Sequence, residues 1–386
     1  MIKISFIGDI MCEPLMLKAA GKADGSFDFS PVFAHVKDLL AESDYVVGNL
    51  ETPLAGKQAV YVNELFSFNA PDEFAQAVKA AGVDFVSTAN NHCMDRGLEG
   101  LKKTIDALDN AGLSHDGTHS QCQENPPFIV DVKGTKISII PFTYGTNYGM
   151  HHVALPEQEY VDLLHSDTDP VYLTKKKGKL SKIKQVIFKP LKTEQIAAIK
   201  KALGMEYNYS RKDDYLDKDK VKPYFSRLER KIKKAKEAAD LVMFYPHVGG
   251  QFNIEPGRFT EYTVEKGLSF GADAIIASHP HIVQKAEISG KVPVFYSIGN
   301  FSMSPNSVYL LHENLPEYGL IVHLYIEEGK IKKTTFSVIK MKEEKDSILT
   351  VIPVADDEDI VIEDVRKIYN TVTGREMTSV EREFEL

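Results

Sequence analysis

The chain has 386 residues and a formal net charge of −9, with 43% hydrophobic and 26% charged residues. This composition is ordinary for a globular protein and argues against a disordered or fibrous chain. Cys12, Cys93 and Cys122 lack C-x-x-C spacing, which argues against a disulfide framework, and no stretch approaches the roughly 18 apolar residues of a transmembrane helix. We therefore expect a cytoplasmic protein, or an envelope-associated one if a leader or anchor has been removed.

Apolar strands and amphipathic helices alternate through the first part of the chain. The segments that read as buried strands are residues 2–7, 45–47 and 83–86. Helices are predicted where apolar side chains fall on one face, at residues 30–41, 71–81 and 97–110. This alternation predicts an α/β architecture.

The alternation of predicted strands and helices is interrupted after Pro126 and resumes later in the chain. Hairpins are predicted at residues 128–141 and 319–340, each across a turn that contains glycine. Between them lie strands at residues 241–245, 274–277 and 292–296 and a helix at 260–269. A last helix begins at Asp364 and leads to an acidic tail. We expect one domain over residues 1–345 and a C-terminal extension over 346–386.

Residues 157–236 differ in composition from the rest of the chain. They contain 21 lysines and arginines against 12 acidic residues, a net charge of +9. The pattern predicts a helical basic insertion whose charges face solvent. As an alternative, the clustered lysines could bind a polyanion such as polyglutamate. We expect no nucleic-acid partner, because no nucleic-acid-binding motif is recognisable.

Polar side chains follow six of the predicted strands. They are Asp9, Glu51, the pair Asn91 and His92, His247, the pair His279 and His281, and Asn300. Ligands of α/β proteins bind at the carboxyl ends of strands, so these groups should meet at one edge. Carboxylates, imidazoles and an amide suit Mn, Zn or Fe, and a bridging carboxylate can hold two ions about 3.5–4 Å apart. The set predicts a metal site and, as its chemistry, hydrolysis of phosphate esters.

Each group alone has a simpler explanation, such as a helix cap at Asn91 or an ordinary βα turn at Asp9. Their order, however, resembles a known series of motifs. The matching segments are Gly8-Asp9-Ile10-Met11, Gly48-Asn49-Leu50-Glu51, Ala89-Asn90-Asn91-His92, Thr143-Tyr144-Gly145-Thr146-Asn147, Ser278-His279-Pro280-His281 and Tyr296-Ser297-Ile298-Gly299-Asn300-Phe301. In this order they resemble the CapA family of poly-γ-glutamate capsule biosynthesis proteins.

That family is similar to the calcineurin-like metallophosphoesterases, and the resemblance implies a four-layered α/β/β/α sandwich with one or two divalent metal ions. It implies that Glu51 is the bridging carboxylate. One ion would be completed by Asp9 and His281. The other would be completed by Asn91, His247 and His279.

The resemblance also implies residues that act on the substrate. His92 would contact phosphate or protonate the leaving group. Asp95 and Arg96 would orient His92 or meet a substrate oxyanion, although a salt-bridged helix start explains them equally well. Further substrate contacts are expected from Asn49, Tyr144, Gln251 and Asn300.

Two positions depart from the pattern. Phosphoesterases place a histidine two residues after the first aspartate, where this chain has Met11, a poor ligand for hard ions. The family tends to follow the His247 position with Trp-Gly and a glutamate, where this chain has Gln251, so a role for that acid is in doubt. Cys12 and Cys93 adjoin motifs but are expected to be buried apolar groups rather than ligands.

These features together predict a CapA-like protein of poly-γ-glutamate capsule or envelope-polymer metabolism, acting as a metal-dependent hydrolase of the phosphoesterase type on a polyanionic or phosphorylated substrate. Two alternatives stay open. One is a non-catalytic accessory protein that binds a polyanion. The other is a metal-dependent hydrolase of γ-glutamyl amide bonds.

Overall fold

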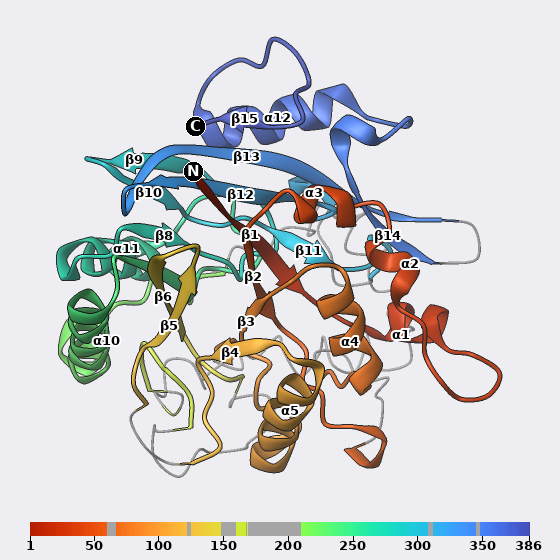
Figure 1. The fold of residues 1–386 in the computed structure, drawn as a ribbon, viewed down its shortest axis with the longest axis horizontal. Coiled ribbons are helices and arrows are strands. Elements are labelled where there is room, and N and C mark those ends of the chain that lie inside the picture. Colours follow the sequence, from red (N-terminus) through yellow and green to blue (C-terminus); the bar gives the residue numbers. More distant parts are fainter. Residues whose placement is uncertain are drawn as a thin grey trace, which may run out of the picture.

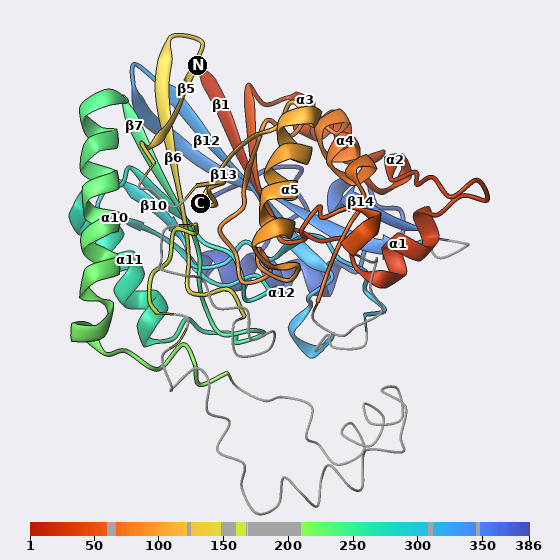
Figure 2. The same cartoon turned by 90° about the horizontal axis from the view of Figure 1, so that it is seen from below.

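The structure is a computed structural model that describes residues 1–59, 67–121, 125–147, 160–166, 168, 210–307, 312–344 and 348–386. Its strands form two sheets that pack face to face, with helices on both outer faces (Figures 1 and 2). The predicted four-layered α/β/β/α sandwich is therefore confirmed. In the described parts of the chain, no helix has both the length and the apolar character needed to cross a membrane.

The first sheet runs in the order β14-β13-β12-β1-β2-β3-β4, with β11 paired to β1 and β15 to β13. Its strands are β1 (Ile2–Ile10), β2 (Tyr45–Leu50), β3 (Phe85–Ser87), β4 (Ser114–Asp116), β11 (Asn300–Ser302), β12 (Tyr318–Glu327), β13 (Lys330–Glu343), β14 (Leu349–Pro353) and β15 (Phe384–Glu385). Strands β1 to β4 are parallel, so their carboxyl ends share one edge. Strands β14 and β15 come from the predicted C-terminal extension and pair with β13.

The second sheet runs in the order β5-β6-β7-β8-β10-β9. Its strands are β5 (Phe128–Val132), β6 (Thr135–Thr143), β7 (Leu241–His247), β8 (Ala274–Ile276), β9 (Ala286–Ser289) and β10 (Val292–Phe295). Strands β6, β7, β8 and β10 are parallel, and both predicted hairpins, β5-β6 and β12-β13, form as expected.

The helices cover the two outer faces of the sheets. They are α1 (Pro14–Ala20), α2 (Ser30–Phe33), α3 (Lys37–Ala41), α4 (Asp72–Ala80), α5 (Gly97–Ala111), α10 (Lys218–Ala238) and α11 (Arg258–Phe270), with short 3-10 turns at Lys57–Ala59, His312–Asn314 and Val354–Asp356. Helix α12 (Ile362–Thr373) instead packs on the apolar cluster between the sheets, through Val365, Ile368 and Val372. Helices α1 to α5 lie on the side of the first sheet, whereas α10 and α11 lie on the side of the second (Figure 2).

Three apolar clusters join these layers. One lies between the sheets and brings Phe6 of β1 beside Tyr245 of β7, with the ring centroids 5.6 Å apart. The second joins α2 and α4 to the first sheet, and the third joins α10 to the second sheet and includes Leu228 of α10 and Phe244 of β7. Burial of each such side chain stabilises the folded protein by about 1.5–3 kcal/mol. The packed layers therefore hold in place the strands whose ends carry the polar side chains.

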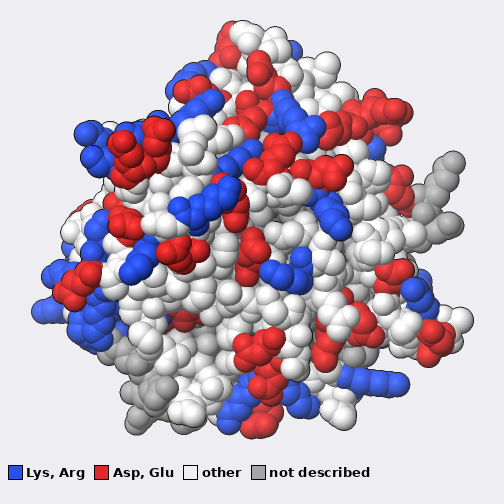
Figure 3. Space-filling view, viewed as in Figure 1, with Lys and Arg blue, Asp and Glu red and all other residues white. Residues whose placement is uncertain are grey.

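One predicted element differs from the structure. The helix predicted at residues 30–41 is split into α2 and α3 by a tight turn, in which the N–H of Val36 donates to the carbonyl of Phe33 at 3.3 Å. This turn keeps both Phe33 and Val36 buried. The end of the predicted basic insertion forms α10, which connects β6 to β7, whereas residues 169–209 lie outside the described residues. Figure 3 shows basic and acidic side chains interspersed on the face viewed in Figure 1.

Candidate metal centre

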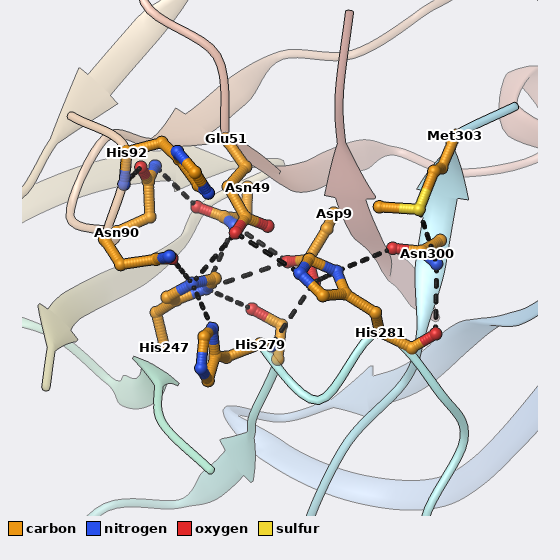
Figure 4. A network of polar contacts seen from close by, with 12 residues as sticks. Asp9, Asn49, Glu51, Asn90, His92, His247, His279, His281, Asn300 and Met303 are labelled. Atoms are coloured by element: carbon orange, nitrogen blue, oxygen red, sulfur yellow. Dashed lines mark hydrogen bonds and ion pairs between the residues drawn. The ribbon is translucent and has the colours of Figure 1, made fainter. Parts of the chain in front are cut away.

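The strand ends of both sheets converge on one buried polar cluster (Figure 4). Asp9 lies at the end of β1 and Glu51 follows β2, both in the first sheet. His247 ends β7 of the second sheet, and His279 and His281 follow β8. The structure brings together all six predicted ligands, which are at most 5% exposed: Asp9, Glu51, Asn91, His247, His279 and His281.

Glycines let the backbone approach closely at two of these motifs. A Cβ atom on Gly8 would lie 2.0 Å from the carbonyl oxygen of Gly299, so only glycine lets β11 pair beside Asp9. Gly249 has a φ of 141°, and a Cβ there would lie 2.6 Å from the ring of Pro280. These contacts explain why glycine precedes Asp9 and why the turn after His247 is rich in glycine.

The backbone at the two histidines after β8 is strained. His279 has a φ of 110° and His281 a φ of 59°, values that side chains other than glycine rarely adopt. Each such residue costs roughly 1–3 kcal/mol, and strain of this kind is concentrated at functional sites. The fold therefore holds both imidazoles in the cluster against a local preference for another conformation.

Two groups of donor atoms in this cluster are compact enough to bind a metal ion. One is Asp9, Glu51 and His247, and the other is Glu51, His279 and His281; in each, the donor atoms lie within 4.8 Å of one another. Glu51 is common to both groups. The grouping differs from the one that the resemblance implies, in which Asp9 goes with His281 and His247 goes with His279.

Shorter distances also connect the residues of that implied grouping. His281 Nδ1 is 3.3 Å from Asp9 Oδ2, and His247 Nε2 is 3.1 Å from His279 Nδ1. The Oδ1 atom of Asn91 lies 2.7 Å from His247 Nε2. The six residues thus form one continuous cluster that could hold one or two ions.

Glu51 provides the test of whether a cation fits. Its carboxylate is fully buried, and within the described residues neither of its oxygens accepts a hydrogen bond. The nearest basic atoms are His247 Nε2 at 3.4 Å and His281 Nε2 at 3.7 Å. A buried carboxylate without hydrogen bonds is unfavourable by several kcal/mol. Oxygen and imidazole donors around it form a set that suits Mn, Zn or Fe.

The cluster also sets the protonation of its members. Burial would raise the pKa of Asp9, but hydrogen bonding to His281 and the charge of His247 outweigh burial and lower this pKa to about 2. Burial and the neighbouring histidines hold the pKa of His279 well below its usual value. An ionised carboxylate and a neutral imidazole are the forms that bind metal ions.

His281 behaves differently from His279. Burial lowers the pKa of His281. The charge of Glu51 and the hydrogen bond and charge of Asp9 outweigh burial and raise this pKa to about 9. The site therefore places a protonated imidazole between two carboxylates when they have no other positive partner.

His92 lies at the side of the cluster, beside Asn90 and Glu51 (Figure 4). Its Nδ1 is 2.8 Å from Asp95 Oδ2, which also accepts the backbone N–H of Phe68 at 2.7 Å. The ring of Phe68 lies 4.6 Å from the imidazole. Asp95 therefore orients His92. The Arg96 guanidinium donates to the hydroxyl and carbonyl of Ser67 and to the backbone carbonyl of Asp95.

The four residues expected at the substrate occupy different places. Asn49 donates to Asp9 Oδ1 at 2.8 Å and lies 3.2 Å from His247 Nδ1, so it contacts two predicted ligands. Asn300 lies behind His281, 2.9 Å from its Nδ1. Tyr144 is half-buried, with its ring 4.5 Å from that of His279, whereas Gln251 is half-buried in the turn after β7.

Met11, Cys12 and Cys93 lie in apolar surroundings. Met11 and Cys12 belong to the cluster between the first sheet and its helices, and Cys93 packs in a smaller cluster with Met94. Burial, followed by the charge of Glu13, raises the pKa of Cys12 well above its usual value. The Cys12 thiol is thus kept protonated, in a form that does not bind metal ions.

A second buried charge cluster was not predicted from the sequence. Asp116, His119 and Asp162 also have donor atoms within 4.8 Å of one another. Here the Nζ of Lys231, on α10, lies 2.8 Å from Asp116 and 2.7 Å from Asp162, and Arg227 lies 2.8 Å from Asp162. The protein supplies the cations of this cluster itself.

A signal for this second cluster was present in the sequence. Lys231 is one residue before Ile232 and three after Leu228, so it falls on the apolar face of a predicted helix. A lysine in that position is buried only when it is paired.

Comparison with known proteins places the chain in a family. Residues 3–304 match the model of the bacterial capsule synthesis protein PGA_cap family. The capsule biosynthesis protein CapA of Bacillus anthracis is 25% identical over 356 residues, which cover 88% of this chain and 71% of the relative. The PGA biosynthesis protein CapA of Bacillus subtilis strain 168 is 22% identical, over 78% of this chain and 63% of the relative.

Solved structures resemble the chain more distantly. A hypothetical protein from Thermus thermophilus gives a TM-score of 0.46 at 14% identity and covers 88% of this chain and 99% of that one. The 5′-nucleotidase of Candida albicans gives 0.41 at 9% identity, over 90% of this chain and 53% of that one. These likenesses are too distant to assign a function. The family match covers most of the chain, and the protein therefore belongs to the bacterial capsule synthesis protein PGA_cap family, which confirms the resemblance to CapA.

Proposed function

We propose that this protein is a divalent-metal-dependent hydrolase of the phosphoesterase type that acts in the metabolism of poly-γ-glutamate capsule or a related envelope polymer. The observation that carries the proposal is Glu51, a fully buried carboxylate whose oxygens accept no hydrogen bond from the described residues. It lies among imidazoles from the other sheet. A divalent ion would supply the missing positive charge.

Asp9, Glu51, Asn91, His247, His279 and His281 would hold the ions. Bound ions would supply Lewis acidity, which lowers the pKa of water and offsets charge on a phosphoryl group. The residues of the chain would then have two roles, to fix the metal ligands and to transfer a proton. They fix the ligands through the strained backbone at His279 and His281, and through Asn49, which donates to Asp9.

The second role is proton transfer at the leaving group. Asp95 accepts the hydrogen on Nδ1 of His92, which leaves Nε2 as the atom that can exchange a proton. As water attacks phosphorus and the ester oxygen departs, His92 would give that oxygen a proton from Nε2. A residue in this role contributes a rate factor of about 10²–10⁴.

The test is hydrolysis of generic phosphomonoesters and phosphodiesters by protein loaded with Mn, Zn or Fe. We expect activity with at least one ion and a loss of more than about 100-fold in His279→Ala. His35→Ala is the matched control, because His35 is exposed on the surface and its removal should leave the rate unchanged. Loaded wild-type protein that hydrolyses neither ester class with any of the ions would contradict the proposal.

The same reaction mixtures separate the amide alternative. Hydrolysis of a γ-glutamyl bond adds water and yields a γ-carboxylate and a free α-amine, whereas hydrolysis of a phosphate ester yields an alcohol and phosphate. New amines from poly-γ-glutamate, without activity on either ester class, would identify the protein as an amide hydrolase at the same metal centre.

The polyanion-binding alternative needs variants that spare α10, because this helix connects β6 to β7. Replacing Lys175, Lys176 and Lys177 by serine removes three of the clustered charges and leaves α10 intact. If the basic segment holds polyglutamate, the salt needed to release the protein from immobilised polymer should fall. Unchanged retention would remove the basis for this alternative.

A further inference from the structure

Asn300 is fully buried behind His281, at the start of β11. Its amide nitrogen Nδ2 lies 3.0 Å from the carbonyl oxygen of His281 and 3.0 Å from that of Pro316. Its amide oxygen Oδ1 lies 2.9 Å from His281 Nδ1. Both ends of the amide thus bind protein atoms, so Asn300 faces the imidazole from behind instead of facing a substrate.

The orientation of this amide follows from its partners. Backbone carbonyls only accept hydrogen bonds, so the nitrogen of Asn300 must face the carbonyls of His281 and Pro316. A reversed amide would place its oxygen against both of them. The oxygen of Asn300 therefore faces His281, and the hydrogen of that contact must come from His281 Nδ1.

The other ring nitrogen of His281 is then free to bind a ligand. Asp9 Oδ2, 3.3 Å from Nδ1, is also an acceptor only, so both neighbours of Nδ1 require a hydrogen there. In the neutral ring the lone pair lies on Nε2, which faces Glu51 Oε1 at 3.7 Å. The Asn300 contact is the shorter of the two. Without it, Asp9 would be the remaining acceptor for Nδ1–H.

We propose that Asn300 is a positioning residue that holds His281 as an Nε2 ligand and leaves the Asp9 carboxylate available to the metal. This inference rests on the proposed metal centre. Partners that fix the tautomer and direction of a metal-binding histidine typically change metal affinity by 10–100-fold when they are removed. Asn300 therefore acts through His281 and does not contact the substrate.

Two variants separate this role from simple support of the backbone. Asn300→Asp keeps an oxygen facing His281 Nδ1 and, as a buried carboxylic acid, one O–H that can donate to only one of the two carbonyls, whereas Asn300→Leu loses both the oxygen and the donor. Zinc affinity, measured by competition with a chelator, should fall about 10–100-fold in the leucine variant and stay near the wild-type value in the aspartate variant.

Nitrogen NMR of zinc-loaded protein with 15N-labelled histidine gives a second readout. His281 should show a protonated Nδ1 and a metal-bound Nε2 in the wild type and in Asn300→Asp, and a shifted Nδ1 signal in Asn300→Leu. Asn253→Leu is the control, because Asn253 is equally buried but binds the backbone of Ser210. It should leave both zinc affinity and the His281 signals unchanged.

Equal losses of zinc affinity in Asn300→Asp and Asn300→Leu would overturn the proposal, since the donor to the backbone would then be what matters. If the leucine variant does not fold, the aspartate variant decides alone: a tenfold loss of affinity, or loss of its Nδ1 signal, overturns the proposal. Wild-type protein that binds no zinc would instead contradict the metal centre itself.

Discussion

Two buried clusters of carboxylates and histidines differ in the source of their positive charge. In the first, Asp9 and Glu51 form ion pairs, among the described residues, with histidines only. In the second, Asp116 and Asp162 are joined by the ammonium of Lys231. Buried carboxylates need a cation in both places. The second cluster is complete as a structural element, and the first is the one that could hold an external ion.

The largest expected effect concerns Glu51. In Glu51→Gln the charge common to both donor groups is lost, so metal content should fall and ester hydrolysis should decrease by about 10³-fold or more, given that hydrolytic enzymes accelerate reactions by at least about 10⁶-fold. Metal analysis and initial rates measure both. Glu13→Gln is the control, because Glu13 is also buried but accepts from Ser304 and Ser307 outside the cluster. Full metal content in Glu51→Gln would contradict the assignment.

Breaking the second cluster should affect stability instead of metal binding. Lys231→Met leaves Asp116 and Asp162 buried without their ammonium partner, so the free energy of unfolding should fall by about 3–5 kcal/mol. Denaturant titration measures this change. Lys233→Met, on the same helix, removes an exposed pair with Glu229 and should change stability by less than about 1 kcal/mol. A loss of bound metal in folded Lys231→Met would break the distinction between the clusters.

A smaller effect is expected at the side of the first cluster. His92→Ala should lower ester hydrolysis by about 10²-fold, because it removes the proton donor, and should leave metal content unchanged. His115→Ala provides the comparison, since His115 forms a similar pair with Asp109 at the surface, 3.1 Å apart. A wild-type rate in His92→Ala would exclude proton transfer by this residue.

The mildest test is acid stability. Burial would raise the pKa of Asp162, but Lys231 and His119 outweigh burial and hold this pKa far below its usual value of about 3.9. A carboxyl group whose pKa is lower in the folded than in the unfolded protein stabilises the folded protein at pH values above its unfolded-state pKa. The stabilisation from Asp162 should therefore be present above about pH 4 and be lost as the pH falls further. A variant that combines Asp116→Asn, Asp162→Asn and Lys231→Met should therefore lose less stability on acidification than the wild type. An identical acid profile would contradict the contribution of the ion pairs.

The sequence and the structure agree where chemistry follows a strand. Glu51 and His279 could be predicted because each follows a short apolar run, and parallel strands bring such positions to one edge. The order of these motifs along the chain then matched the motif series of the CapA family. The direction of single side chains could not be predicted: Asn300 lies in a motif expected at the substrate, but close approach of β11 to Gly8 places it behind His281.

The second cluster lay beyond sequence reasoning for a different reason. Asp116 and Lys231 are 115 residues apart, and the segment that brings Asp162 to the same ammonium group belongs to neither sheet. Nothing in their spacing forms a motif. Only Lys231 on an apolar helix face indicated a buried partner, and its identity depends on how α10 packs on the second sheet.

The most direct test of the difference between the clusters is the number of metal ions per chain. Plasma emission on protein purified without chelators, then loaded with Mn, Zn or Fe, should find one or two ions in the wild type and fewer in Glu51→Gln. The variant that combines Asp116→Asn, Asp162→Asn and Lys231→Met should keep the wild-type number. The assignment of the metal centre would be contradicted by wild-type protein that binds none of these ions, by a wild-type count in Glu51→Gln, or by a loss of ions in the combined variant.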